Sequence, residues 1–325
     1  MTPGGTRMSE ARSATGTVVV AVGGNSIIDP KGGRGNLDTH DLARELCEQI
    51  ASLAGRYASV VLTHGNGPQV GFELLRNEAA KSVVPPDGMD VNVAATQGYI
   101  GYILQQVLGD VLEERNEEVP ICSLVTQVEV DPGDPGFQNP TKPVGPFYSA
   151  EEAAALSSGQ GWRMKEDAGR GFRRVVPSPK PLKIIELPSI RNLVHSGQIV
   201  ICTGGGGIPV VRRGKRFEGV AAVIDKDLAS ALLASGLGAQ DFIISTGVPE
   251  VYADFGKPGQ RALRRVGSDE VIRLRNEGHF ASGSMLPKID ASLDFIRNGG
   301  SRVVITSPDS ILSSLDGETG TTIVP

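Results

Sequence analysis

The sequence predicts an α/β protein, a three-layer α/β/α sandwich around an open, mostly parallel sheet. Runs of β-branched residues, such as 17–22 and 59–63, alternate with stretches of helical periodicity, such as 37–57. Several runs end in glycine-rich loops, and 42 of the 325 residues are glycine. Since helices cross over the sheet to join parallel strands, this alternation predicts helices on both faces and right-handed crossovers.

The first two predicted strands end in sequences typical of a ligand site. Both are followed by glycine and asparagine residues, namely Gly23, Gly24, Asn25, Gly65, Asn66 and Gly67. Open α/β sheets bind ligands at the carboxyl ends of their strands. Between these strands, the helix at 37–57 places Leu42, Leu46, Ile50 and Leu53 on one face, which we expect to be buried.

The middle of the chain changes character. A helix is predicted at 93–115 and a strand at 121–130, whereas 131–187 is rich in proline and glycine and has helical character only at 151–157. A segment of that length without strong periodicity is typical of a functional lid. We therefore expect 131–187 to protrude from one domain instead of forming a domain of its own.

The remainder returns to regular elements. The predicted helices are 187–196, 228–235 and 288–298, the predicted strands are 198–203, 241–245 and 302–306, and a hairpin is predicted at 210–220. The apolar run 221–224 is interpreted as a buried strand that leads into Asp225, Lys226 and Asp227. Two carboxylates around an ammonium group at the end of a buried strand are costly unless a polar ligand binds there.

Composition excludes several classes of function. The net charge of -5 provides no basic footprint for nucleic acid or anionic membranes, and no segment is apolar enough to span a bilayer. The cysteines Cys47, Cys122 and Cys202 are widely spaced and flanked by apolar residues, which predicts reduced thiols in a cytoplasmic protein. Residues 1–16 are polar, so we expect them to form a disordered leader.

The glycine loops favour phosphate or another small anion, because backbone N–H groups can surround oxygens at helix starts. The common nucleotide motifs are absent: Gly214 and Lys215 lack a Walker A context, and the glycines after the second strand miss the dinucleotide spacing. Any one loop is more often a structural turn. His64 is the only histidine in a predicted functional loop, and a structural or substrate-contacting role is favoured over that of a general base.

Three lysines are candidates for binding such an anion: Lys142 in a proline frame, Lys226, and Lys288 at a predicted helix start. Phosphoryl transfer needs positive charge around the moving group and little covalent help. Asp225 and Asp227 could hold magnesium, or could hold the lysines in register. Most lysines are solvated surface residues, but Lys226 follows a buried run and Lys142 lies in a rigid proline frame.

A set of motifs in order along 17–325 closely resembles carbamate kinases. The motifs are AVGGN (21–25), THGNGPQVG (63–71), FQNPTKPVGPFY (137–148, preceded by Asp131 and Pro132), RVVPSPKP (174–181), GGGGIP (204–209), VIDKDLA (223–229), GSMLPK (283–288) and GTT (320–322). The resemblance implies the amino-acid kinase fold as one two-lobed domain over 17–325. Its N-terminal lobe (about 17–200) would hold the acid and its C-terminal lobe (about 201–325) the nucleotide, with 131–187 as the protruding subdomain.

The resemblance also implies residue roles. The catalytic residues would be Lys142, Lys226, Asp227 and Lys288. The substrate-binding residues would be Gly23, Gly24, Asn25, Gly65, Asn66 and Gly67. The nucleotide-side residues would be Gly205, Gly206, Asp225, Tyr252, Lys257 and Met285. Related acid kinases carry a lysine where this chain has Asn25, so Lys142 would supply that charge, and 245–252 departs from the family's usual form near adenine.

The implied activity is reversible phosphoryl transfer between ATP and carbamate, with Mg²⁺, in arginine or carbamoyl phosphate metabolism, by a cytoplasmic homodimer. Two alternatives remain open on the sequence: a kinase of another small carboxylate or carbamate on the same fold, and a non-catalytic sensor of nucleotide or carbamoyl phosphate. A sensor would be expected to lack one of the lysines or Asp227, and all of them are present.

Overall fold

The central element is an eight-stranded sheet with the strand order β15-β17-β16-β12-β1-β2-β9-β3. The structure, a computed structural model, describes residues 16–23, 27, 36–167, 169–281 and 283–325. The predictions for Gly24, Asn25 and the leader up to residue 15 lie outside these residues. The strands are β1 (Thr17–Val22), β2 (Ser59–His64), β3 (Ile121–Ser123), β9 (Ile199–Ile201), β12 (Asp241–Ser245), β15 (Arg265–Gly267), β16 (Arg302–Thr306) and β17 (Thr321–Val324). Neighbours are parallel except β16 and β17, so the mostly parallel sheet is confirmed.

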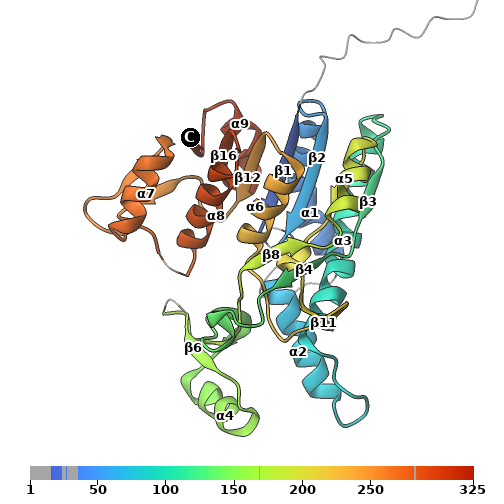
Figure 1. Cartoon of the computed structure of the whole chain (residues 1–325), viewed down its shortest axis with the longest axis vertical. Coiled ribbons are helices and arrows are strands. Elements are labelled where there is room, and N and C mark those ends of the chain that lie inside the picture. Colours follow the sequence, from blue (N-terminus) through green and yellow to red (C-terminus); the bar gives the residue numbers. More distant parts are fainter. Residues whose placement is uncertain (1–15, 24–26, 28–35, 168, 282) are drawn as a thin grey trace, which may run out of the picture.

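Helices cover both faces of this sheet and give the predicted three layers (Figure 1). The helices are α1 (Asn36–Ala54), α2 (Gly67–Ala80), α3 (Met89–Glu114), α4 (Ala150–Gln160), α5 (Leu187–His195), α6 (Lys226–Leu237), α7 (Ser268–Asn276), α8 (Met285–Arg297) and α9 (Ile311–Leu315). Alternate residues of β1 point to opposite faces. Val18 and Val20 pack with residues of α1 and α3, whereas Val19 packs with residues of α6 and α8.

Smaller sheets surround the central one. One has the order β11-β10-β4-β8, from β4 (Gln127–Val130), β8 (Pro181–Ile184), β10 (Ile208–Arg213) and β11 (Arg216–Gly219). β13 (Val251–Ala253) and β14 (Arg261–Leu263) form a hairpin. β5 (Lys142–Tyr148), β6 (Met164–Glu166) and β7 (Phe172–Val176) form a third sheet that, with α4, protrudes below the body in Figure 1. These elements lie within the segment 131–187 that we expected to protrude, and from here on the name protruding subdomain is used for residues 142–176 alone.

Two of the predicted strands and the predicted burial of one residue are wrong. The single strand at 121–130 is two strands, β3 and β4, in different sheets, because the chain turns at Thr126, whose amide N–H donates to the Gln97 side chain at 2.8 Å. The run 221–224 is buried at Ala222, Val223 and Ile224 but is not a strand; its contacts include a hydrogen bond from the Val223 N–H to the Pro177 carbonyl at 2.9 Å. Leu42 is 45% exposed, since the buried stripe of α1 runs through Ala43 and Leu46 instead.

The sequence reasoning also missed α2 and α7. Helix α2 begins inside the glycine loop, with Gly67 and Pro68 in its first turn, so residues that mark a loop also start a helix. Helix α7 buries only Val271 and Leu274, which gives too weak a hydrophobic stripe to stand out. Within the described residues, no helix is both long enough and apolar enough to cross a membrane.

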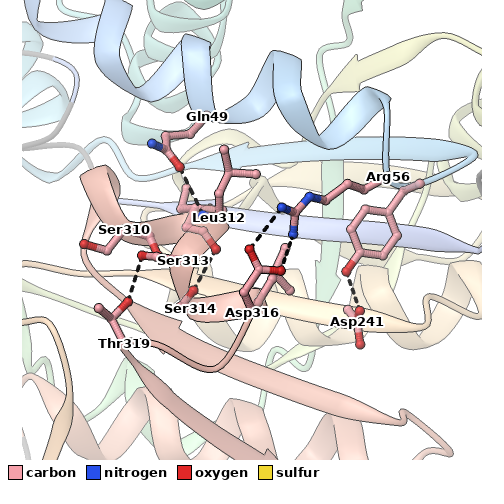
Figure 2. Close-up of polar contacts among 12 residues, drawn as sticks. Gln49, Arg56, Asp241, Ser310, Leu312, Ser313, Ser314, Asp316 and Thr319 are labelled. Atoms are coloured by element: carbon pink, nitrogen blue, oxygen red, sulfur yellow. Dashed lines mark hydrogen bonds and ion pairs between the residues drawn. The ribbon is translucent and has the colours of Figure 1, made fainter.

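Two ionic clusters connect strands and helices at the amino ends of the parallel strands, opposite the glycine loops. Asp241 at the start of β12 accepts hydrogen bonds from Arg302 Nη2 at 2.6 Å and from the Tyr57 hydroxyl at 2.5 Å. Burial and the bond to Asp241 raise the pKa of Tyr57, which keeps its hydroxyl as a donor. Nearby, Arg56 pairs with Asp316 at 2.8 Å, close to the contacts of α1 with α9 in Figure 2. The first cluster has an almost fully buried carboxylate, and the second is exposed.

We predict that Arg302→Met destabilises the protein by roughly 3 kcal/mol, because it leaves the buried Asp241 carboxylate without a cation. Arg56→Met is the matched control, and its exposed ion pair should contribute only about 0.5 kcal/mol. Urea unfolding followed by circular dichroism measures both. Equal losses of unfolding free energy in the two variants would contradict the assignment.

Candidate active site

The candidate site is a cavity of about 480 Å³ at the carboxyl edge of β1, β2 and β12. Its lining includes many of the predicted site residues, namely Gly23, Gly65, Asn66, Gly67, Lys142, Gly205, Asp225, Lys226, Asp227 and Lys288. These residues come from all parts of the chain, and the parallel sheet places their loops along one edge. The sequence therefore predicted ten of the 21 lining residues, and the role of each of the ten stays a prediction.

Asp227 is the central charge of the site. Its Oδ1 accepts from Lys226 Nζ at 2.6 Å and its Oδ2 from Lys288 Nζ at 2.9 Å, and only 3% of its side chain is exposed. Burial alone would raise the pKa of Asp227, but the two ammonium groups outweigh burial and hold the pKa well below its usual value. Burial also opposes the charge on Lys288, and pairing with Asp227 more than compensates, so the pKa of Lys288 is raised.

Asp225 starts α6 and also binds the protruding subdomain. Its Oδ1 caps the helix by accepting from the backbone N–H groups of Asp227 at 2.9 Å and Leu228 at 3.4 Å. Its Oδ2 accepts from Lys142 Nζ at 2.6 Å, and Lys142 lies in β5. Burial would raise the pKa of Asp225, whereas Lys142 lowers it, and the net direction is down. One carboxylate thus fixes both the helix start and the lysine of the subdomain.

Helix α3 holds two glycine loops, the one after β2 at 65–67 and the one after β9 at 204–207. The Asn66 side chain donates to Thr96 Oγ1 at 2.9 Å, and Gln97 Nε2 donates to the Gly204 carbonyl at 2.8 Å. The φ angle of Gly205 is +66°, and a β-carbon there would lie 2.2 Å from Asn66 Nδ2, so glycine is required. Thr96 and Gln97 were missed by the sequence reasoning. Their only signal was two adjacent polar residues on the inward face of an apolar helix.

His64 lies at the end of β2 and is fully buried behind the loop. Its Nδ1 contacts the Gly65 carbonyl at 3.2 Å, and its ring is close to Gly204. Burial lowers the pKa of His64 to about 4, with a further contribution from the positive charge of Lys226. The imidazole is therefore neutral at pH 7. Because it does not line the cavity, its position fits the structural role better than contact with substrate.

The predicted nucleotide-side residues are not all at the cavity. The ring of Tyr252 packs against that of Phe255 in a tilted arrangement with centroids 5.9 Å apart, and Lys257 pairs with Asp254 at 3.1 Å on the β13–β14 hairpin. Gly206 and Met285 likewise lie outside the lining. Instead, the lining contains Ser245, Thr246, Gly247 and Ser284, and Ser245 has a buried hydroxyl without a hydrogen-bond partner among the described residues.

The carboxylates of the site fit a metal ion that arrives with a bound ligand better than they fit a metal ion held by the protein alone. Among the described residues, no group of three or more histidine, cysteine, aspartate or glutamate side chains could hold a metal ion. Mg²⁺ is usually held by one or two carboxylates together with substrate phosphates. Asp227 accepts from two lysines, whereas Asp225 accepts from one lysine and two backbone N–H groups, so Asp225 is the carboxylate that could contribute with fewer ammonium groups to displace.

The arrangement is suited to a polyanion with a reacting phosphoryl group. Three ammonium groups reach one cavity, and the N-terminal ends of α2, α6 and α8 adjoin it. Helix N-termini carry partial positive charge and unpaired N–H groups. In a partly buried site such fixed charges stabilise developing negative charge without reorganising.

Comparisons with known proteins agree with this geometry. The model of the Amino acid kinase family matches residues 16–307. A carbamate kinase of Thermococcus kodakarensis is 48% identical over 312 residues, which cover 94% of this chain and 98% of that protein. Carbamate kinase-like protein YahI of Escherichia coli is 47% identical over 311 residues, which cover 94% of this chain and 98% of that protein.

Solved structures give the same result. A carbamate kinase from Giardia lamblia bound to AMP-PNP superposes with a TM-score of 0.85 at 42% identity, covering 96% of this chain and 99% of that one. The same enzyme bound to citric acid gives a TM-score of 0.89 at 42% identity with the same coverage.

We predict that the stability of the protein falls as the pH drops from about 6.5 to about 4. His64 has a folded-state pKa of about 4, below its unfolded value, so the unfolded chain binds the proton first. The preferential protonation of the unfolded chain lowers the free energy of unfolding by up to about 3 kcal/mol over this pH range. His64→Gln should abolish this part of the pH dependence of the unfolding free energy. Urea unfolding at pH 7 and pH 4.5 tests it, with His195→Gln, at an exposed position, as control. An unchanged slope in His64→Gln would refute the assignment.

Proposed function

The chain belongs to the amino acid kinase family, and from this membership and the site geometry we propose that it is a carbamate kinase. It transfers a phosphoryl group reversibly between ATP and carbamate, giving ADP and carbamoyl phosphate. The observation that carries the proposal is the convergence of Lys142, Lys226 and Lys288 around one cavity, with Asp227 between two of them. The relatives with this name are similar over nearly their whole length.

The chemistry needs positioning and charge more than covalent catalysis. Lys226 and Lys288 neutralise the phosphoryl oxygens, and Asp227 holds both ammonium groups at hydrogen-bonding distance. Lys142, which pairs with Asp225, adds a third positive charge to the lining of the cavity. Carbamate is already an oxyanion, so it requires no general base, which agrees with a buried, neutral His64.

The two substrates enter from different sides of the cavity. The loops after β1 and β2 hold carbamate in the N-terminal lobe, about 17–200, and the loops around Gly205 and 245–247 hold the nucleotide phosphates in the C-terminal lobe, about 201–325. Tyr252, Lys257, Gly206 and Met285 remain proposed nucleotide contacts. Mg²⁺ arrives with ATP, which supplies phosphate oxygens as ligands, and Asp225 is the carboxylate that could join them.

The physiological setting is also part of the proposal. The three cysteines are free thiols, which fits a reducing cytoplasm. An enzyme of this kind can regenerate ATP from carbamoyl phosphate during arginine breakdown. Relatives of about the same identity include proteins named carbamate kinase and carbamate kinase-like, so substrate assays are more decisive than the degree of identity.

We predict that the purified protein forms ATP from carbamoyl phosphate and ADP in the presence of Mg²⁺, and that EDTA stops the reaction. Lys288→Ala should lower kcat by about 100-fold or more, because it removes one fixed charge from the transferred group. Coupled ATP detection measures both, and Lys215→Ala, on the exposed turn between β10 and β11, is the matched control.

The outcomes separate the alternatives. Turnover with acetyl phosphate but not with carbamoyl phosphate would indicate a kinase of another small acid. Tight binding of nucleotide by calorimetry without any turnover would indicate a sensor. Lys288→Ala with the full wild-type rate would remove the proposed role of that lysine.

We further propose a homodimer, built on an exposed apolar patch of α3 and the loop beside it. The patch comprises Val91, Tyr99, Tyr102 and Val125, which are 47%, 39%, 60% and 54% exposed. The three residues of α3 lie on one side of the helix. Val125 lies in the loop after β3, a strand that contacts the same helix. Grouped exposed apolar residues of this kind often mark protein interfaces.

We predict that Tyr102→Glu converts the dimer into monomers, because it places a charge at the most exposed residue of the apolar patch. Light scattering after size-exclusion chromatography measures the mass. Leu182→Glu, at an exposed leucine of β8 outside the patch, should leave the mass unchanged. A monomeric wild-type protein, or a dimeric Tyr102→Glu variant, would count against this interface.

A further inference from the structure

The protruding subdomain contacts the rest of the protein at a place where the backbones of two glycines meet. Gly71 lies in α2, and Gly145 lies in β5. A β-carbon placed on Gly71 would lie 2.0 Å from Gly145 Cα and 2.3 Å from its nitrogen. An ordinary contact is at least 3.4 Å, so any side chain at Gly71 would push β5 away by more than 1 Å.

The position of Gly145 is fixed from its other side as well. Its φ angle of +76° favours glycine, and its carbonyl accepts from Arg173 Nε at 3.0 Å. The pairing of β5 with β7 is interrupted between Val144 and Tyr148, as in a β-bulge, so β5 bends where it meets α2. Arg173 is itself held by Asp167 at 3.3 Å.

Apolar residues also pack where the protruding subdomain contacts α2. Val70 of α2, Val144 of β5 and Val176 of β7 are almost fully buried and belong to one cluster with Val210 and Val223 of the body. The base of the subdomain therefore packs as a part of the main core. Interiors packed in this way resist displacement, because a shifted strand loses contacts on one side.

The contact joins two parts of the candidate site. Helix α2 begins at Gly67, within the loop that lines the cavity, and Gly71 is in its second turn. Strand β5 begins at Lys142, whose ammonium group is 2.6 Å from Asp225. A displacement of β5 at Gly145 moves the strand that carries this lysine.

We propose that Gly71 and Gly145 are positioning residues. Their close contact fixes the position of β5 against α2, and thereby the position of Lys142 relative to the loop at 65–67. The inference rests on the proposed function for the role of Lys142 in turnover. The contact geometry on which it depends does not require that function. Neither glycine touches the reacting atoms.

The test is Gly71→Ala, in which one methyl group displaces β5. Because misplacing a reacting group by about 1 Å can cost about 100-fold, we expect kcat to fall by about that factor. Combined with Lys142→Ala, the substitution should cause no further loss, since the lysine it displaces is already absent. An unrelated distortion of the substrate loop would instead multiply the two losses.

A second readout does not depend on activity. Lys142 pairs with Asp225 and its side chain is only 29% exposed, so limiting acetic anhydride should label it slowly in the wild-type protein. In Gly71→Ala its labelling, measured by mass spectrometry relative to the exposed Lys215, should rise severalfold. Gly109→Ala is the control, because a β-carbon at this α3 glycine meets nothing within 4 Å.

The outcomes distinguish this inference from the proposed function. If the wild-type protein lacks kinase activity, the proposed function fails, and the labelling still decides whether the glycine contact positions Lys142. If Gly71→Ala does not fold, Val144→Ala loosens the same junction and should also raise Lys142 labelling. Unchanged labelling in a folded variant, or losses of kcat that multiply in the double variant, would overturn the inference.

Discussion

The burial of two lysines beside one cavity depends on the carboxylate of Asp227 between them. Burial opposes the positive charge of both lysines: it lowers the pKa of Lys226 in spite of Asp227, whereas pairing with Asp227 outweighs burial at Lys288 and raises its pKa. Asp227 accepts from both at 2.6 and 2.9 Å and is itself buried. A phosphoryl group that approaches the lysines meets positive charge that is already oriented, which is the condition for catalysis by fixed electrostatics.

The scaffold explains how these residues meet. Asp227 lies in the first turn of α6 because Asp225 caps that helix, and Lys288 lies near the start of α8, so two helix starts converge on one carboxylate. Both helices pack on the same face of the sheet, through a core that includes Leu233 and Leu293. The relative position of Asp227 and Lys288 therefore depends on the apolar contact between α6 and α8. A substitution that loosens this contact would also displace the charged residues.

Lys142 depends on a different set of contacts. It belongs to a subdomain with its own small sheet, yet Val144 and Val176 at the base of that sheet are buried in the body. The ion pair with Asp225 then connects the subdomain to the cap of α6. The loop after β2, the protruding subdomain and the start of α6 are joined in this way through direct contacts, so one cavity has walls from distant parts of the chain.

The sequence by itself determined the alternation of strands and helices, the glycine loops after β1 and β2, and the three lysines with their aspartates. These features are local, because hydrophobic period and turn residues act over a few positions. Only the tertiary structure decided that 221–224 is not a strand, that Gln97 and Thr96 hold the loops, and that Lys142 pairs with Asp225. Such features depend on partners far away in the chain, and local pattern carries no information about which buried polar groups will meet.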